Sequence, residues 1–358
     1  MEDFYRDQRR RFDVLMEPDG KPAGGRFNYD KDNRRPPKEG LSAPAPYRPE
    51  EDEIDLQVRR DLDALDLPEF GEDGPRQFPA TAAEARHALD DFIANRLPGF
   101  GTWQDAMVPG ERWLFHSLLS SSLNLWLLDP LDAVRAAEAA YRDGHADINA
   151  VEGFVRQILG WREYVWAMYW LRADAWRADN ALGATAPLPE VFWTGDTDLE
   201  CLRQAMTDVR ESGYAHHILR LMVLGNLQLL LGVKPWESVE WFRSAFVDGA
   251  EWVMAPNAAG MATWADGGAM MTKPYAASGR YIDRMSRFCG DCRFTPTKRT
   301  GDDACPVTQL YWDFMAANRD ALAPNRRMRN QVRMVERFDA VELAEVRAGA
   351  AAVKRRLA

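Results

Sequence analysis

Three of the four cysteines in this sequence lie close together, in the stretch RFCGDCRFTPTKRTGDDACP at residues 287–306. Cys289 and Cys292 are separated by two residues, and Cys305 directly precedes Pro306. Thiolates at such a spacing are typical metal ligands. Zinc sites usually combine two such knuckles, or one knuckle with two histidines, and neither partner follows here. The pattern therefore favours a four-thiolate iron–sulfur cluster with Cys201 as the fourth ligand. Zinc and unrelated free thiols remain alternatives, and Cys201 alone is typical of a buried core residue.

A second pattern that could do chemistry is the adjacent pair His216 and His217 in GYAHHILRLM. Imidazole titrates near neutrality and is the commonest general acid and base in proteins. Because neighbouring residues on a helix point about 100° apart, only one of the two rings faces any given cleft. A helix-capping histidine beside an exposed one is the alternative interpretation.

Hydroxyl side chains gather in HSLLSSSLN, at Ser117, Ser120, Ser121 and Ser122, beside the amide of Asn124. If a helix begins in this stretch, its free N–H groups and these hydroxyls could bind a pyrophosphate. A polar helix start without a ligand is the alternative. The sequence also holds 13 tryptophans. Large aromatic side chains usually pack in a core, and a flat-ring ligand or an electron-hopping chain is the sharper alternative.

The elements that must position these residues are predicted to be helical from about residue 81 onward, since the apolar residues recur at helical spacing and no segment alternates as a strand. The fold class is therefore all-α. The expected helices cover 81–97, 129–144, 149–173, 198–213, 215–232 and 234–249. Thr81 is expected to cap the first, which should end before Pro98, and Gly144 to end the second. The helix at 149–173 is apolar on more than one face and should be largely buried. Residues 17–53, rich in Pro, Gly and charge, should form an extended arm.

Composition narrows the function classes. The 358 residues are 46% apolar, enough for a sizeable core, and no stretch is long and apolar enough to span a membrane. The charged N-terminus and the low cysteine content indicate a cytoplasmic protein with reduced thiols. The net charge of −10 argues weakly against nucleic acid, yet basic residues concentrate in two runs. The runs are Lys273, Arg280, Arg284, Arg287, Arg293, Lys298 and Arg299, and then Arg326, Arg327, Arg329 and Arg333. A solvated face would explain them equally well.

Taken together, several stretches resemble the prokaryotic (6-4) photolyases of the iron–sulfur photolyase/cryptochrome family, over almost the whole chain. They are EGFVRQILGWREYVWAMYW, GYAHHILRLMVLGN, and WVMAPNAAGMATWADGGAMMTKPYAASGRYIDRMSRFCGDCRF followed by GDDACP and LYWDF. The resemblance implies a [4Fe–4S] cluster on Cys201, Cys289, Cys292 and Cys305. It also implies a helical FAD domain at 81–358 that includes the iron–sulfur region, with 1–80 as the remnant of an interdomain arm.

The family resemblance implies light-dependent repair of (6-4) pyrimidine–pyrimidone photoproducts in UV-damaged DNA, by electron transfer from excited reduced FAD. A flipped lesion would enter the flavin pocket, where a histidine supplies a proton. His217, supported by His216, is expected to take that role, with Tyr275 at the active site. Trp241 and Trp193 resemble the tryptophans that relay electrons to the flavin. The expected FAD contacts are Ser117, Ser120, Asn124, Gln157, Trp161, Arg162 and Asp248. The expected DNA contacts are Lys273, Arg293, Lys298 and Arg299, and the cluster would make the loop that carries the last three rigid.

The sequence departs from the family pattern at three points. The N-terminal α/β domain is absent, which suggests a truncated form and makes a lumazine antenna unexpected. Met254 stands where some members have a glutamate near flavin N5, and Ser121 stands where a proline is usual. The chain is expected to be a monomer without membrane attachment. A cryptochrome-like blue-light photoreceptor with little repair activity is the first alternative function, and an iron–sulfur nucleic-acid-binding module without flavin is the second.

Overall fold

The protein is helical throughout the described part of the chain. The structure is a computed structural model that describes residues 1–357, and these residues form no strand, only isolated β-bridges. The prediction of an all-α fold is confirmed. The α-helices are α1 (Glu2–Phe12), α2 (Glu53–Ala64), α3 (Ala82–Asp91), α4 (Leu97–Trp103), α5 (Ser120–Asn124), α6 (Pro130–Arg142), α7 (Ile148–Val155), α8 (Glu163–Leu171), α9 (Ala175–Ala178), α10 (Val191–Thr194), α11 (Glu200–Ser212), α12 (Asn226–Leu231), α13 (Pro235–Ala245), α14 (Glu251–Met254), α15 (Gly279–Met285), α16 (Pro306–Ala317), α17 (Arg319–Leu322), α18 (Arg329–Val335) and α19 (Ala340–Leu357).

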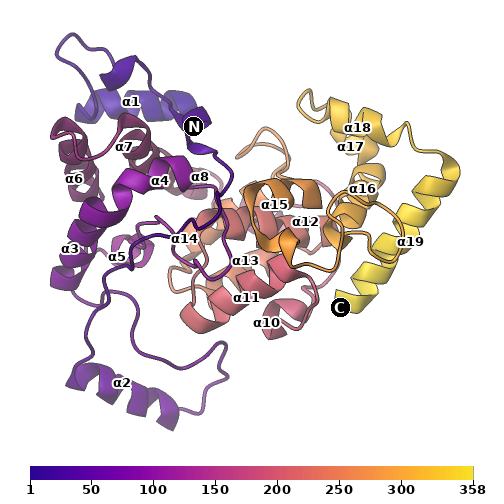
Figure 1. The fold of residues 1–358 in the computed structure, drawn as a ribbon, viewed down its shortest axis with the longest axis horizontal. Helices are drawn as coiled ribbons and strands as arrows, with labels where there is room; N and C mark the ends of the chain where they lie inside the picture. The colour runs from indigo at the N-terminus through magenta and orange to yellow at the C-terminus, as the bar shows by residue number, and fades with distance from the viewer. Residues whose placement is uncertain (358) are drawn as a thin grey trace.

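Two hydrophobic cores organise these helices. One is built from side chains between residues 5 and 159, which come mainly from α1, α3, α6 and α7. The larger core takes nearly all its side chains from residues 165 to 357, including α11 to α16 and α19. Figure 1 shows α1, α3, α4, α6 and α7 on one side of the molecule, α11 to α15 in the middle and α16 to α19 at the far end. No described helix is long and apolar enough to cross a membrane.

The N-terminal segment is not only an extended arm but also part of the first hydrophobic core. Residues 17–52 contain only short 3₁₀ turns, as an extended arm predicts, but α1 precedes them and α2 follows. Tyr5, Val14 and Leu15 are fully buried in the first core, so the beginning of the chain is part of that core. The domain boundary at residue 80 therefore stays a prediction.

The predicted helix ends hold in part. Thr81 caps α3 with a reciprocal capping box to Glu84, and Gly144 follows α6 in the left-handed conformation with φ 74°. The predicted stop before Pro98 is wrong. A π turn at Phe92–Arg96 leads directly into α4, where Pro98 occupies the first turn and needs no N–H donor.

The expectation that the helix at 149–173 is largely buried is right only for its first half. A π turn at Arg156–Arg162 separates the buried α7 from α8. On α8, Trp166 is 41% exposed and Trp170 59% exposed. The extra residue of a π turn rotates the helix that follows, so an apolar face can leave the core while the apolar sequence continues.

The first testable prediction concerns Glu84, which joins Arg76 to the start of α3. Its carboxylate accepts from Arg76 at 2.8 Å and from the backbone N–H of Thr81 at 3.1 Å. The Arg76 side chain lowers the pKa of Glu84 from 4.5 to about 2. A carboxylate with a lowered folded-state pKa stabilises the fold above its unfolded pKa, and this contribution disappears as the pH falls from 4.5 towards 2.

We expect Glu84→Gln to lower the free energy of unfolding by about 1–2 kcal/mol at neutral pH, because the variant loses the charged partner of Arg76. The difference from the wild type should shrink as the pH is lowered through this window, and circular dichroism during thermal unfolding measures it. A difference that stays constant down to pH 2 would show that the charge of Glu84 is not responsible. Glu53→Gln, at an exposed position in the first turn of α2, is the matched control.

Candidate functional site

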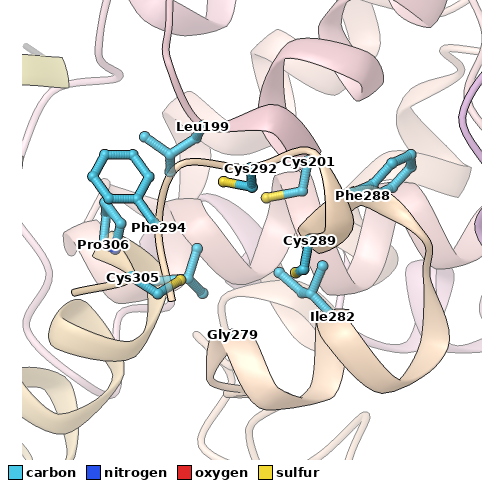
Figure 2. A pocket seen from close by; sticks show the side chains of 11 residues that line it. Leu199, Cys201, Gly279, Ile282, Phe288, Cys289, Cys292, Phe294, Cys305 and Pro306 are labelled. Atoms are coloured by element: carbon cyan, nitrogen blue, oxygen red, sulfur yellow. The ribbon is translucent and has the colours of Figure 1, made fainter. Parts of the chain in front are cut away.

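The four cysteines, which are distant in sequence, line one apolar cavity. Cys201 comes from the first turn of α11, Cys289 and Cys292 from the turn after α15, and Cys305 directly precedes α16. Apolar side chains complete the lining: Leu199, Ile282, Phe288, Phe294, Pro306 and Val307. Figure 2 shows the four sulfur atoms around a common space with these apolar groups outside them. Burial raises the pKa of Cys201 and of Cys305, and it raises the pKa of Cys289 to about 12. A bound cation would offset the cost of holding thiolates there.

The spacing of these sulfur atoms has a chemical consequence. Among residues 1–357, no three His, Cys, Asp or Glu side chains converge closely enough to ligate a single metal ion. A single zinc ion would bring four sulfur atoms to about 2.3 Å from one point. The four cysteines surround one cavity, and thiolates are ligands both for zinc and for an iron–sulfur cluster.

Gly279 shows how tightly this cavity is shaped. A β-carbon added at Gly279 would lie 2.6 Å from Cys305 Sγ and 2.9 Å from Thr308 Oγ1. The Gly279 N–H donates to Thr308 Oγ1 at 3.0 Å, and that hydroxyl donates to the Pro296 carbonyl at 2.7 Å. Gly279 therefore lets α15 approach the start of α16, and it leaves the Cys305 thiol free to point into the cavity.

The second testable prediction follows from this contact. Gly279→Ala should displace the Cys305 thiol and lower the amount of metal bound per chain, because the new methyl group takes the space beside the sulfur. Metal analysis of the purified variant measures the loss. Gly290→Ala is the matched control, since a β-carbon at Gly290 in the same cysteine-rich turn meets nothing within 4 Å. Equal metal content in both variants would contradict the prediction.

A second site surrounds the two adjacent histidines. His217 begins the helical segment that continues through the π turn at Leu219–Gly225, and His216 immediately precedes it. His216 is buried, whereas the ring of His217 is exposed. Desolvation by the surrounding protein nevertheless lowers the pKa of His217 to about 4, with a smaller contribution from Arg220. The exposed His217, rather than the buried His216, can therefore reach a ligand.

Arg220 and Asp248 form a partly buried ion pair beside these histidines. Arg220 Nη1 and Asp248 Oδ1 are 2.8 Å apart, and the backbone carbonyl of Asp248 accepts from Asn124 Nδ2 at 3.1 Å. The structure thus brings Asn124 and Asp248 together, although they are far apart in sequence. Arg220 was missed in the sequence. Its signal was a charged residue three positions after His217 in an otherwise apolar helix, hence on the same helix face.

The other expected FAD contacts lie on neighbouring elements. Gln157, Trp161 and Arg162 belong to the π turn at Arg156–Arg162, and Trp161 is half-buried against the larger core. The Arg162 guanidinium lies over the rings of Trp126 and Trp252 at 5.8 and 5.2 Å. π turns often mark functional sites, and three of the four here lie at Trp161, Arg220 and the residues after Met254.

The serine cluster also contains two buried hydroxyls, beside the two expected to contact FAD. Ser117 and Ser120 are only partly buried. The hydroxyls of Ser121 and Ser122 are buried in α5 and have no hydrogen-bond partner among the described residues. Buried hydroxyls without a partner are costly, so these two oxygens are the better candidates for ligand contacts.

The two expected relay tryptophans are not in direct contact. Trp241 is fully buried and donates from Nε1 to the Phe192 carbonyl at 2.8 Å. The ring centroids of Trp241 and Phe192 are 5.3 Å apart. Trp193, the next residue along the chain, is 39% exposed and contacts Phe70. On the other side, Trp241 contacts Phe246, whose ring lies 4.3 Å from the Arg220 guanidinium. Aromatic rings therefore connect the Arg220 guanidinium to Phe192, the residue before Trp193.

The basic residues between the cysteine ligands are ion-paired within the protein. Arg293 pairs with Asp198 at 3.1 Å, Lys298 with Asp303 at 2.6 Å, and Arg299 with Glu342 at 3.1 Å. The loop is therefore less positive than its sequence indicates. Lys273 is half-buried near Arg327, and Tyr275 is half-buried close by. Desolvation raises the pKa of Tyr275.

Comparison with known proteins identifies relatives along the full chain. A sequence profile described as deoxyribodipyrimidine photo-lyase-related protein matches residues 1–78. The chain is 43% identical over 357 residues to a protein of Agrobacterium fabrum named (6-4) photolyase, covering all of this chain and 70% of that protein. An uncharacterized protein of Acanthamoeba polyphaga mimivirus is 30% identical over 113 residues, which is 31% of this chain and 85% of the viral protein.

Among solved structures, a bacterial class III photolyase from Agrobacterium tumefaciens has a TM-score of 0.46 and 17% identity, and the match covers 77% of this chain and 56% of that one. A cryptochrome from Synechocystis has a TM-score of 0.45 and 14% identity, with 81% and 59% coverage. The chain thus spans less than two thirds of both solved chains.

Proposed function

Because this chain belongs to the family of the (6-4) photolyases and photolyase-related proteins, we propose that it repairs (6-4) pyrimidine–pyrimidone photoproducts in DNA with the energy of light. The single observation that carries the proposal beyond family membership is His217. His217 is exposed, its pKa is lowered by desolvation, and it precedes a partly buried ion pair on the same helical segment. A proton donor placed where it can touch a ligand is what this repair requires.

The residues around His217 fit a flavin dinucleotide. The buried hydroxyls of Ser121 and Ser122 have no partner among residues 1–357, and hydroxyls of this kind can donate to a pyrophosphate. A second set of cofactor contacts would come from Asn124, Asp248 and Arg220, which a hydrogen bond and an ion pair hold together. When bound, FAD supplies the light-driven electron. The chain supplies orientation, exclusion of water and the proton of His217.

The aromatic side chains give an electron a route from the surface to this site. Trp193 is exposed, Trp241 is buried behind Phe192, and Phe246 reaches the Arg220–Asp248 pair. We propose that this route serves to reduce the bound flavin. Phe192 interrupts this route between the two tryptophans, and Phe246 interrupts it between Trp241 and the ion pair.

We further propose that Cys201, Cys289, Cys292 and Cys305 bind a [4Fe–4S] cluster. Four thiols and no other donor line the cavity, and the apolar rim would shield a charged cluster from water. The cluster would link α11 to the segment between α15 and α16 through metal–thiolate bonds. Without it, the two parts are held together only by noncovalent packing in the larger core.

The basic residues expected to bind DNA differ in whether the protein already neutralises their charge. Lys273 lies close to Arg327 and Arg34, so like charges gather near Tyr275. We propose that Lys273 contacts a phosphate there. Arg293, Lys298 and Arg299 would bind phosphates only by exchanging their carboxylate partners, which reduces the free energy they can contribute.

The experiment that tests the function is chromatographic analysis of an oligonucleotide with a single (6-4) lesion after incubation with flavin-loaded protein, in blue light and in the dark. We expect the two pyrimidines to be restored only in the light. A cyclobutane dimer in the same sequence is the control for lesion preference. Absence of restoration in the light, with flavin bound, would contradict the proposed function.

A further inference from the structure

The π turn at Arg156–Arg162 carries three of the expected flavin contacts, which are Gln157, Trp161 and Arg162. One of them also points to a ligand, because the Arg162 Nε atom is buried and has no hydrogen-bond partner among residues 1–357. A buried donor without a partner is costly, so a bound ligand is expected to complete its hydrogen bonds. The position of this turn therefore decides whether these side chains can reach the cofactor together.

Aromatic side chains of α1 contact the chain on both sides of Trp161. The ring centroids of Phe4 and Tyr164 are 5.8 Å apart, and those of Tyr164 and Trp161 are 6.2 Å apart. Tyr5 reaches the residue before Trp161, since a β-carbon added at Gly160 would lie 3.1 Å from Tyr5 Cδ2. That distance is shorter than an ordinary β-carbon contact, so glycine at this position lets the two segments approach closely.

A buried ion network fixes the start of the same turn. Glu152 is fully buried, and Arg156, the first residue of the turn, is 4% exposed. Arg156 Nε lies 3.0 Å from Glu152 Oε1, and Arg156 Nη1 lies 3.4 Å from Asp30 Oδ1. The other Glu152 oxygen accepts from the Tyr29 N–H at 2.9 Å. Because removing one partner of a buried pair leaves an uncompensated charge, this network holds the extended arm and the turn together.

The conformation of the turn decides where its side chains point. A π turn contains one residue more than a turn of α-helix, and one residue corresponds to a rotation of about 100°. If the segment relaxed to a regular α-helix, the side chains after the extra residue would rotate by this angle relative to those before it. Trp161 and Arg162 would then no longer face the same ligand as Gln157. A π turn is rare, and here the contacts with α1 support it.

Building on the proposed function, in which this turn contacts the flavin, we propose that Phe4 and Tyr5 are positioning residues for flavin binding. They hold the turn in the conformation in which Trp161 and Arg162 both face the cofactor, while the buried ion network fixes where the turn begins. The sequence of residues 1–80 predicts only the remnant of an arm. The contacts of α1 give this part of the chain a role in the flavin site.

The test is Phe4→Ala, because Phe4 is only half-buried and its loss should leave the core intact. We expect the dissociation constant for FAD, measured from the quenching of flavin fluorescence, to rise about two- to tenfold, as the loss of one aromatic pair predicts. Phe4→Tyr keeps the ring and should bind FAD like the wild type. Phe12→Ala is the matched control, since Phe12 is a half-buried ring at the other end of the same helix.

A second measurement follows Trp161 without the flavin. In flavin-free protein labelled with 5-fluorotryptophan, the ¹⁹F NMR signal of Trp161 is the one that is absent in Trp161→Phe. We expect this signal to shift in Phe4→Ala and also in Gly160→Ala, whose new methyl group would meet Tyr5. It should not shift in Phe12→Ala. Thermal unfolding of the flavin-free variants should show no larger loss of stability in Phe4→Ala than in Phe12→Ala.

The outcomes separate positioning from stability and from the proposed function. Equal FAD affinity in Phe4→Ala and Phe12→Ala overturns the role of Phe4, and so does a Trp161 signal that stays in place in Phe4→Ala and Gly160→Ala. A loss of FAD affinity that follows the unfolding temperature in both phenylalanine variants would mean that α1 only stabilises the fold, and it overturns the proposal as well. A wild-type protein that binds no FAD overturns the proposed function instead. In that case, the ¹⁹F signal decides alone whether α1 positions Trp161.

Discussion

Replacing His217 with alanine is expected to reduce light-dependent repair about 100-fold or more, which is the usual contribution of a general acid. The reason is geometric: His217 has the exposed ring of the adjacent pair, whereas His216 is buried and stacked on His116. The flavin should remain bound, because the Arg220–Asp248 pair and the buried serine hydroxyls are unchanged in this variant.

The measurement is repair per absorbed photon on a (6-4) oligonucleotide, with the flavin absorption spectrum recorded on the same sample. His145→Ala is the control, since the His145 ring contacts backbone carbonyls at Ile93 and Ala94 instead. Repair within a few-fold of the wild type in His217→Ala would remove His217 from the mechanism. Loss of flavin together with repair would indicate a binding role.

The pKa of His217 also predicts how repair depends on pH. Desolvation lowers it to about 4, so the protonated fraction in the free protein falls about tenfold for each pH unit above 4. If the cationic ring is the donor, repair should increase as the pH is lowered from 8 to 6. Bound DNA, with its negative phosphates, raises the pKa of a nearby imidazole and would move this increase to higher pH. The slope should vanish in His217→Ala.

Replacing Cys201 with serine is expected to abolish cluster binding, with loss of the bound iron and of the broad visible absorption of an iron–sulfur protein. Cys201 is the only one of the four ligands outside the segment at 289–305. Its loss would therefore disconnect α11 from the cluster, and the thermal unfolding temperature should fall by several degrees.

Iron and acid-labile sulfide, measured per chain in the wild type and the variant, test this expectation. Cys292→Ser should give the same result, because all four thiols line one cavity. Met206→Leu on the same helix is the control for packing of α11, where Met206 is fully buried. Stoichiometric zinc in place of iron in the wild-type protein would contradict the cluster assignment.

Local patterns in the sequence were enough to predict the helices and many of their ends. Helical periodicity, the cap at Thr81 and the glycine after α6 depend on residues within a few positions of one another, and these predictions are confirmed. The predicted helix end before Pro98 and the predicted burial of α8 were wrong. In both cases a π turn changes the phase of the helix, and composition does not reveal it. The cysteine spacing likewise identified three thiols as one group.

Only the tertiary structure decided which distant residues meet. It places Cys201 beside three cysteines that lie 88 or more positions later, and it joins Asn124 to Asp248. It also pairs Arg293, Lys298 and Arg299 with carboxylates, where the sequence showed only a positive loop. The stack of His116 on His216 had no sequence signal, since the two rings come from segments 100 positions apart. Sequence patterns record the period of each element, whereas contacts between elements depend on how all their side chains pack together.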